Sequence, residues 1–167
     1  SRASHGGATE IEDFLMGMHG NSLGTAARAA REIDLGGRRR LLDLGGGPGT
    51  WAVQFVLANP GLHATIFDLP TSKPFAERIV GAAGIGDRVS FTGGDFTADE
   101  LPGGFDVAWL SHILHSEGPA MCRAIVGKAA RALEPGGLLL VHEFILDDSR
   151  TSPIFPALFS LNMLAGT

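Results

Sequence analysis

The sequence predicts a doubly wound α/β domain with a mostly parallel sheet. Short apolar runs alternate with segments of helical periodicity along the chain, and this alternation is typical of strands joined by crossover helices. The 24 glycines stand at the ends of these segments rather than in a repeat. We expect a helical lead-in over residues 1–35 and a single α/β core over residues 36–167, with helices on both faces of the sheet.

The lead-in predicts two helices. Apolar side chains recur at helical spacing over residues 10–18, and a second, alanine-rich pattern covers residues 23–33. Asn21 or Ser22 is placed to cap the second helix, and the pair of glycines at 36–37 is expected to end it.

The core alternates apolar runs with helical segments. The runs are nearly continuous in apolar residues, as expected of strands that are buried on both faces, and turns rich in glycine or proline separate the segments. The expected strands are 40–44, 63–69, 88–92, 105–111 and 138–146. The expected helices are 50–59, 73–83, 120–133 and a last one from Pro153 to Leu164.

A glycine-rich loop, Gly45-Gly46-Gly47-Pro48-Gly49, follows the first strand. In doubly wound sheets ligands bind at the carboxyl ends of the strands, and glycines let the backbone approach a ligand closely. Residues 47–52 match the dinucleotide pattern G-x-G-x-x-A, so NAD(P) and S-adenosylmethionine are both candidates. Asp43 favours S-adenosylmethionine, because it would repel a pyrophosphate and attract an ammonium. The alternative role of Asp43 is to cap amides of the loop.

Acidic residues also stand at the ends of the next two strands. Asp68 can accept hydrogen bonds from both hydroxyls of a ribose, which either cofactor carries. Asp95 can accept one from the amino group of an adenine, and Phe96 can cover the adenine ring. The alternative for Asp95 is a turn aspartate after Gly93-Gly94. Three acids at three successive strand ends indicate a nucleoside-containing cofactor more strongly than any one of them.

Five segments together resemble the plant-type O-methyltransferases and their bacterial relatives, which act on caffeic acid, hydroxyindoles and polyketides. They stand in the order and spacing of that family: LLDLGGGPGTWA (41–52), IFDLP (66–70), VSFTGGDF (89–96), LSHILH (110–115) and LEPGGLLLVHEFIL (133–146). The glycine loop alone is common to class I methyltransferases, whereas the other segments are more specific. The resemblance implies a Rossmann-like class I methyltransferase fold, with S-adenosylmethionine as cofactor and S-adenosylhomocysteine as product.

The resemblance also implies roles for particular residues. His115 matches the general base of the family, and Glu143, expected in the fifth strand, matches the acid that orients this base. Met18 and Met163 would pack against the acceptor. The residues that would contact the cofactor are Ser22, which resembles a serine at a helix start, and Asp43, Gly45, Gly47, Asp68, Leu69, Asp95, Phe96 and Ser111.

Other histidines leave alternatives open. His112 precedes His115 by three residues and would share its face if this stretch were helical, so the choice of His115 rests on the resemblance. His142 should point to the opposite sheet face from Glu143 and is expected to be structural. The alternative for Glu143 is to pair with a buried cation or to cap a loop.

The sequence departs from the family pattern in three places. The N-terminal dimerisation domain and the final antiparallel strand pair are missing, and Ser116-Glu117-Gly118-Pro119 stands where the family commonly has an Asp-Trp pair. We therefore expect a core that is incomplete at its C-terminus, with its fifth strand as an exposed edge. The full-length protein is expected to be a homodimer.

The expected activity is methyl transfer to a hydroxyl of a small aromatic or polyketide-like acceptor. One alternative is a methyltransferase fold with changed chemistry, such as C- or N-methylation, decarboxylation or hydroxylation. Another is a cofactor-binding module without catalysis. A remote alternative is an NAD(P)-dependent oxidoreductase, against which the absence of tyrosine counts.

Composition excludes several other classes. A net charge of −5 argues against a nucleic-acid partner. Cys122 is the only cysteine, which excludes an internal disulfide, and no metal site is expected. No apolar stretch is long enough to span a membrane. The expected location is the cytoplasm.

Overall fold

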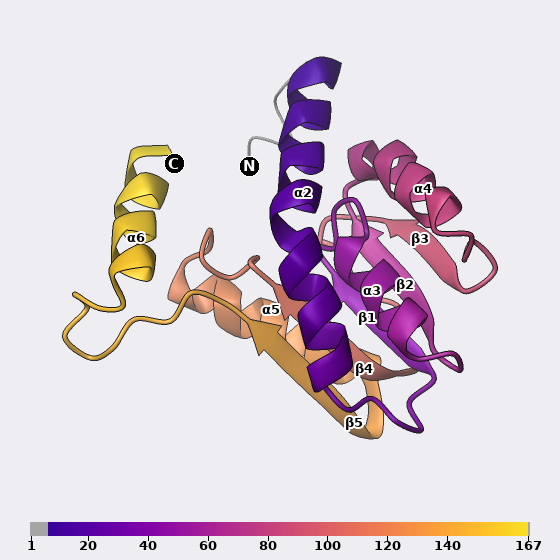
Figure 1. Ribbon diagram of the computed structural model, residues 1–167. Helices are drawn as coiled ribbons and strands as arrows, with labels where there is room; N and C mark the ends of the chain where they lie inside the picture. Colours follow the sequence, from indigo (N-terminus) through magenta and orange to yellow (C-terminus); the bar gives the residue numbers. More distant parts are fainter. Residues whose placement is uncertain (1–6, 167) are drawn as a thin grey trace.

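A single parallel sheet forms the centre of the protein in the computed structural model, which describes residues 7–166. Its strand order is β3-β2-β1-β4-β5, and every pairing is parallel (Figure 1). This arrangement confirms the predicted fold class. The strands are β1 (Arg40–Leu44), β2 (His63–Asp68), β3 (Val89–Gly93), β4 (Phe105–Ser111) and β5 (Leu133–His142).

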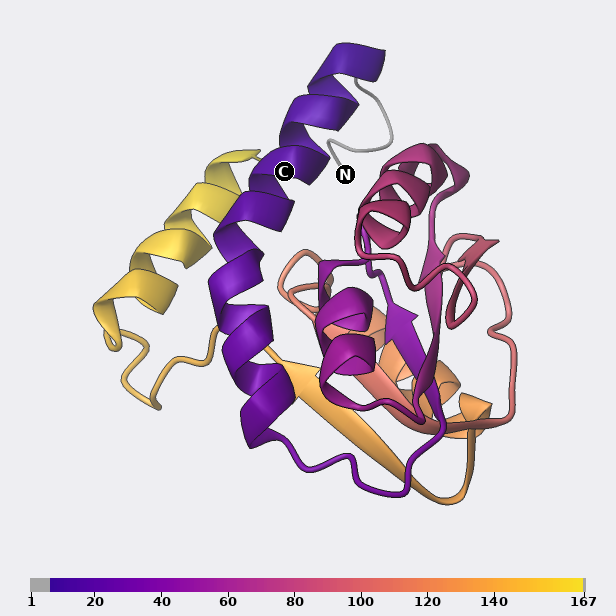
Figure 2. The same ribbon diagram turned by 45° about the vertical axis from the view of Figure 1, so that its right-hand side comes forward.

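Helices cover both faces of the sheet (Figure 2). One apolar core joins α2, α3 and α4 to the sheet through Ala26, Phe55 and Ala76, and a second core joins α5 through Ile125 and Ala129. The helices are α2 (Ala8–Glu32), α3 (Thr50–Ala58), α4 (Lys73–Ala82), α5 (Pro119–Ala132) and α6 (Ile154–Gly166), with a short 3₁₀ turn η1 (Pro70–Ser72).

The prediction of two helices in the lead-in was wrong, because α2 runs without a break from Ala8 to Glu32. Asn21 and Ser22 lie inside this helix and do not cap one. The apolar face continues through the predicted break, since Leu15, Ala26 and Ala30 are all buried. Packing of this face against α3 stabilises a continuous helix despite its internal glycines.

The bounds of the fifth strand also differ from the prediction. β5 begins at Leu133, where it pairs with Phe105, and a register irregularity before Val107 accommodates the proline–glycine turn that was expected to precede the strand. β5 ends at His142, because its partner β4 ends opposite it at Ser111. Glu143 therefore lies one residue beyond the strand rather than within it.

The part of the molecule around β5 and α6 exposes more apolar surface than the rest of the sheet. β5 is an edge strand of the described sheet, and the side chain of Val141 on it is 47% exposed. α6 stands beyond the end of β5 (Figures 1 and 2) and exposes several apolar side chains, among them Phe155, Leu158 and Leu161. Within residues 7–166, no helix has the length and apolar character needed to cross a membrane.

Candidate active site

All five strands end at the same edge of the sheet, because all are parallel, and the site residues predicted at or just after the strand ends gather there. The glycine loop follows β1 and is tied to β2 by a hydrogen bond of 2.8 Å from Gly45 N–H to Phe67 O. Gly45 has a φ of +67°, and a Cβ there would lie 2.5 Å from Ile113 Cγ2 and 3.2 Å from Phe96 Cε1. Only glycine fits this position, where the ends of β1, β3 and β4 converge.

Asp43 lies beneath the loop. Its side chain is only 1% exposed, and its Oδ2 accepts a hydrogen bond of 3.0 Å from Ala52 N–H in the first turn of α3. Burial raises the pKa of Asp43 to about 7, opposed by the Ala52 bond and reinforced by the charge of Asp68. Asp43 therefore caps one amide of the helix that follows the loop, rather than the loop amides of the alternative.

Asp68 holds the glycine loop from the neighbouring strand. Its Oδ2 accepts a hydrogen bond of 2.7 Å from Gly47 N–H, and its Oδ1 accepts bonds from Leu69 N–H at 2.7 Å and Ser72 Oγ at 2.9 Å. Burial raises its pKa against the effect of these three donors. Because each carboxylate oxygen can accept about two hydrogen bonds, Oδ2 keeps capacity for a further donor.

Asp95 and Phe96 follow β3 and have different surroundings. Asp95 Oδ1 accepts hydrogen bonds from Thr97 N–H at 2.8 Å and Thr97 Oγ1 at 2.6 Å, which hold its pKa below the usual range. This is the turn geometry of the alternative reading. Phe96 packs on the apolar core beneath α5, and Lys128 Nζ donates to three carbonyls of this turn, including Phe96 O at 3.2 Å.

One face of α2 lies over the glycine loop. A Cβ at Gly47 would lie 3.5 Å from Leu15 Cδ2, and His19 Nδ1 hydrogen-bonds to Thr50 Oγ1 at 2.9 Å. Ser22 follows His19 by three residues and therefore shares this face. The contact of His19 was missed from the sequence, because nothing in the local pattern pairs it with the start of α3. Met18 lies beside this face and is 36% exposed.

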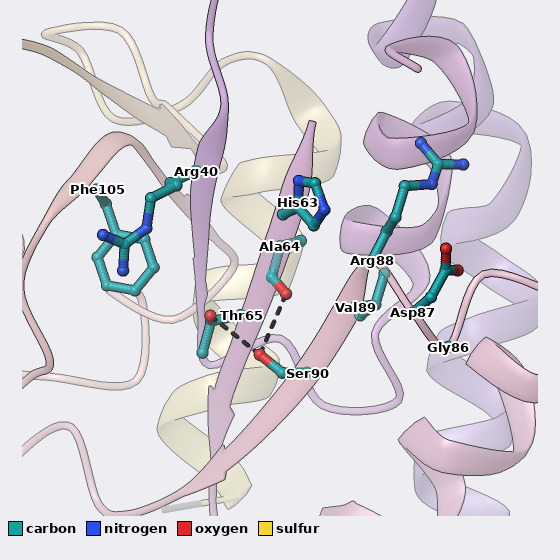
Figure 3. Close-up of a pocket in the computed structure, with 10 residues that line it drawn as sticks. All are labelled: Arg40, His63, Ala64, Thr65, Gly86, Asp87, Arg88, Val89, Ser90 and Phe105. Atoms are coloured by element: carbon teal, nitrogen blue, oxygen red, sulfur yellow. Dashed lines mark hydrogen bonds between the residues drawn. The ribbon is translucent and has the colours of Figure 1, made fainter. Parts of the chain in front are cut away.

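A small hollow lies at the opposite edge of the sheet, where the strands begin (Figure 3). Its volume is about 140 Å³, and Arg40, His63 and Arg88 are among its lining residues. Arg40 lies over the ring of Phe105, while Ser90 Oγ hydrogen-bonds within the sheet. Pockets for cofactor-sized ligands usually measure roughly 300–1,000 Å³, so this hollow is too small for S-adenosylmethionine or NAD.

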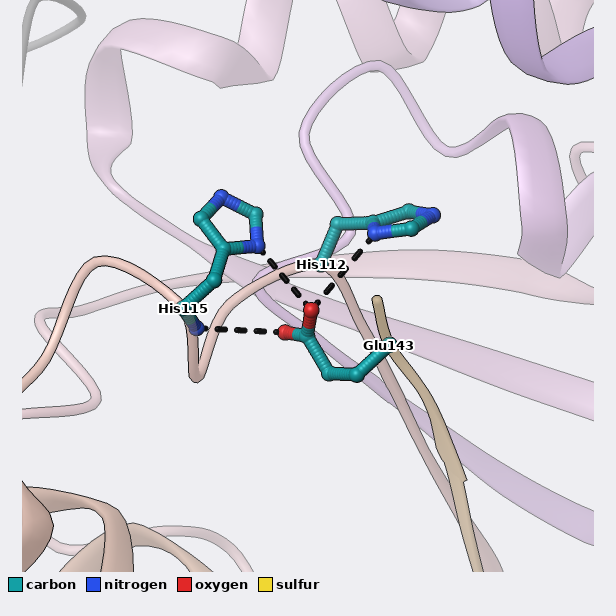
Figure 4. Close-up of side chains that lie close together, drawn as sticks. All are labelled: His112, His115 and Glu143. Carbon is teal, nitrogen blue, oxygen red and sulfur yellow. Dashed lines mark hydrogen bonds and ion pairs between the residues drawn. The ribbon is translucent and has the colours of Figure 1, made fainter. Parts of the chain in front are cut away.

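The ends of β4 and β5 bring together His112, His115 and Glu143 (Figure 4). His115 Nδ1 lies 3.0 Å from Glu143 Oε2, and His112 Nδ1 lies 3.6 Å from the same oxygen. Glu143 Oε1 also accepts hydrogen bonds from the backbone N–H of Leu114 at 2.7 Å and of His115 at 3.3 Å. His112 is not on a helix with His115, since its φ of +55° ends β4 in a tight turn.

This cluster keeps Glu143 ionised and sets the tautomer of a neutral His115. Burial of Glu143 opposes its ionisation, but His112, His115 and the Leu114 N–H together hold its pKa well below the usual range. An ionised carboxylate only accepts hydrogen bonds, so neutral His115 carries its proton on Nδ1 and presents the lone pair of Nε2 on the other side of the ring. Nε2 is the atom that can take a proton from a bound molecule.

Ser111 and His142 form a separate pair behind this cluster. Ser111 Oγ hydrogen-bonds to His142 Nδ1 at 3.0 Å, and the ring of His142 stacks on Trp109 with centroids 5.8 Å apart. Burial and the neighbouring His112 lower the pKa of His142, and Glu143 opposes them. The environment of His142 agrees with its expected structural role.

An aromatic cluster of Phe144, Phe155 and Phe159 lies next to His115. The ring of Phe159 meets His115 edge-on with centroids 5.0 Å apart, and Phe144 contacts both other phenylalanines. This cluster was not predicted from the sequence, although Phe155 and Phe159 stand at helical spacing. Met163 follows on the same helix and is partly buried.

Comparison with known proteins shows which family the chain belongs to. A family model described as the O-methyltransferase domain matches residues 3–167. The chain belongs to the O-methyltransferase family. A similar protein, 3-hydroxy-5-methyl-1-naphthoate 3-O-methyltransferase of Streptomyces sahachiroi, is 38% identical over 156 residues, which are 93% of this chain and 45% of that protein.

Other relatives in the O-methyltransferase family methylate different atoms. N,N-dimethyltransferase OxyT of Streptomyces rimosus is 35% identical over 77% of this chain and 37% of its own length. L-tyrosine C(3)-methyltransferase of Streptomyces lavendulae is 33% identical over 80% of this chain and 36% of its own length. The chain thus spans less than half the length of these curated relatives.

Solved structures of the family share the fold. An O-methyltransferase family protein from Burkholderia thailandensis matches with a TM-score of 0.89 and 32% identity, over 100% of this chain and 51% of that one. Human N-acetylserotonin methyltransferase in complex with S-adenosylmethionine matches with a TM-score of 0.81 and 30% identity, over 95% and 45%. The cofactor of this family is S-adenosylmethionine.

The residues of the glycine-loop edge fit this cofactor of the O-methyltransferase family. No lysine or arginine stands between Asp43 and Thr50, so the loop offers no side-chain cation for a pyrophosphate. The carboxyl group of Asp68 suits a ligand with ribose hydroxyls. Asp68 Oδ2 has the spare acceptor capacity that one such hydroxyl needs.

Proposed function

We propose that this chain is the cofactor-binding and catalytic part of an O-methyltransferase that acts on a hydroxyl of a small aromatic or polyketide-like acceptor. The observation that carries the proposal is the 3.0 Å hydrogen bond between His115 Nδ1 and Glu143 Oε2 at the cofactor edge of the sheet. A base oriented by a carboxylate is what deprotonation of a hydroxyl needs.

The chain's own residues would divide the work as follows. S-adenosylmethionine, when bound, supplies a methyl carbon activated by the sulfonium. His115 Nε2 takes the proton of the acceptor hydroxyl, and the carboxylate of Glu143 stabilises the imidazolium that forms. Asp68, Leu69 and the glycine loop hold the cofactor. Ser22, Asp95, Phe96 and Ser111 remain proposed members of its surroundings.

The aromatic cluster supports the choice of an aromatic acceptor. Phe144 and Phe159 lie beside His115, where planar rings pack favourably on a planar substrate. Met18 on α2 and Met163 on α6 are proposed to contact the same acceptor. The similar Streptomyces sahachiroi enzyme is named for a hydroxynaphthoate, which is a substrate of this class.

N- or C-methylation is the second candidate, favoured by the relatives OxyT and L-tyrosine C(3)-methyltransferase. Loss of His115 separates N-methylation from O-methylation, because a neutral amine can be methylated without a base, whereas a hydroxyl at neutral pH needs one. We further propose that the full-length protein is a homodimer, as the family resemblance implies.

The cofactor assignment is tested by calorimetric titration of the purified protein with S-adenosylhomocysteine and, separately, with NADH. We expect S-adenosylhomocysteine to bind, Asp68→Ala to weaken binding by about tenfold or more through the lost hydrogen bonds, and NADH not to bind. Asp87→Ala, which changes an exposed acid elsewhere, is the matched control. Binding of NADH alone, or binding that Asp68→Ala leaves unchanged, would contradict the assignment.

A further inference from the structure

The cluster of His112, His115 and Glu143 contains more ligand atoms than proton transfer requires. One donor atom from each of the three residues lies within 4.8 Å of the others. Figure 4 shows a ring nitrogen of each histidine directed at the same oxygen of Glu143. A general base with an orienting carboxylate accounts for His115 and Glu143 but leaves His112 without a role.

The imidazole of His112 also lacks a hydrogen bond at one of its nitrogens. His112 Nδ1 is buried and has no hydrogen-bond partner among the described residues. Its distance of 3.6 Å from Glu143 Oε2 is too long for a hydrogen bond. The backbone nevertheless holds His112 in place with a φ of +55°, a conformation that is uncommon for residues other than glycine. A buried ring nitrogen that lacks a hydrogen bond, and whose neighbouring carboxylate oxygen is shared with His115, points to a further ligand.

The spacing of the donor atoms suits a divalent transition metal. Zinc bonds of 2.0–2.1 Å in tetrahedral geometry place neighbouring ligand atoms roughly 3.3 Å apart. The two nitrogen-to-oxygen distances, 3.0 and 3.6 Å, lie on either side of this value. Two imidazoles and one carboxylate are a common zinc ligand set. The side chains of His112, His115 and Glu143 are 24%, 21% and 11% exposed, so an ion can enter from solvent.

We propose that His112, His115 and Glu143 form a binding site for Zn²⁺ or a similar divalent transition metal. The ion is bound by Nδ1 of both histidines and Oε2 of Glu143, with water or another ligand completing its coordination. No metal site was predicted from the sequence, which does not show that these three ligands meet. The fold assembles them from the ends of two adjacent strands.

Metal binding has a consequence for the base, and this part rests on the proposed function. The Nδ1 proton of His115 must leave before Nδ1 can bind the ion, and in the neutral ring it moves through solvent to Nε2. Nε2 then carries a proton and cannot accept one from the acceptor hydroxyl. Zn²⁺ bound at this site therefore blocks methyl transfer while leaving the glycine loop and Asp68 free.

Binding is tested by titrating the full chain with ZnCl₂ in a calorimeter and with CoCl₂ in a visible absorption spectrometer. We expect one ion per chain and, for Co²⁺, the visible bands of a four- or five-coordinate site. Glu143→Gln and His112→Asn should each weaken binding by about tenfold or more. Asparagine is chosen at position 112 because it tolerates positive φ better than most residues.

Controls distinguish a specific loss of metal binding from unfolding of the variant. They also keep the test of the metal site independent of the proposed function. His63→Gln changes an exposed histidine at the start of β2 and should leave metal binding unchanged, while circular dichroism and S-adenosylhomocysteine binding report folding of each variant. Absence of Zn²⁺ binding, or binding that His112→Asn leaves intact, overturns the metal site. The calorimetry decides this without any methyl transfer. Inhibition is then measured separately as the loss of turnover at saturating Zn²⁺.

Discussion

His115 is the residue on which methyl transfer should depend most. We expect His115→Gln to lower kcat by roughly 10²- to 10⁴-fold, the usual contribution of a general base. Glu143→Gln should lower kcat as well, because it removes the charge that stabilises the imidazolium. Initial rates of the full-length protein with S-adenosylmethionine and a hydroxynaphthoate measure both effects, with the KM for the cofactor expected to change little. Loss of activity in His112→Asn together with full activity in His115→Gln would assign the base to His112 instead.

Two glycines with the same kind of backbone differ in the space around them. Gly49 and Gly84 have φ values of +77° and +68°, but a Cβ at Gly49 would lie 2.4 Å from Ile66 Cδ1, whereas a Cβ at Gly84 has open space. Gly84→Ala should therefore cost about 1 kcal/mol of backbone strain. Gly49→Ala should cost about 2–4 kcal/mol, because the clash adds to the strain. Urea denaturation measures both, and equal costs would show that the loop relaxes around the new methyl group.

At the scale of the elements, the continuity of α2 gives a direct test. Gly17, Gly20 and Gly24 lie inside this helix, and a Cβ at any of them meets nothing within 4 Å. Glycine in a helix interior costs up to about 1 kcal/mol relative to alanine. Gly17→Ala and Gly20→Ala should therefore each raise the free energy of unfolding by about that amount. A decrease for Gly20→Ala, measured by thermal unfolding, would support the two separate helices that the sequence suggested.

The elements that could be predicted are those whose sequence pattern matches their final surroundings. β4 has the predicted bounds, because its apolar residues are buried on both faces. β5 was placed too late, because its first residue is fixed by pairing with Phe105, a contact that no local pattern reveals. α2 was divided because glycine and a cap residue predict a break, whereas its packing against α3 keeps the helix continuous.

For the molecule as a whole, the sequence predicted which edge of the sheet holds the site but not how the site residues pair. The parallel order of the strands was enough to place the glycine loop, Asp68 and His115 at one edge. The family resemblance supplied the pairing of His115 with Glu143. Neither source indicated the position of His112 or the aromatic cluster, because these depend on a strained turn after β4 and on where α6 lies.

The buried Asp43 and the half-buried Glu143 and His142 make global stability depend on pH in opposing directions. The pKa of Asp43 is raised by burial to about 7 from 3.8, so between these pH values the folded chain binds more protons than the unfolded chain, and stability falls as pH rises. The pKa of Glu143 is lowered, so its contribution is lost as pH falls below about 4.5. The pKa of His142 is lowered, so its protonation destabilises the fold below about pH 6.5.

Asp43→Asn separates the first of these effects from the other two, because the contributions of Glu143 and His142 largely cancel in the difference between variant and wild type. Asparagine has nearly the shape of aspartate, can accept the hydrogen bond from Ala52 N–H and carries no charge at any pH. The free energy of unfolding of the variant minus that of the wild type should therefore rise between pH 4.5 and pH 7.5. The full shift of about three pKa units sets an upper limit of roughly 4 kcal/mol on this rise.

Urea denaturation across this range measures the difference, and Asp87→Asn, at an exposed position, should give a flat curve. A flat curve for Asp43→Asn as well would mean that the carboxyl of Asp43 titrates alike in the folded and unfolded chains, so that burial beneath the glycine loop does not hold its proton.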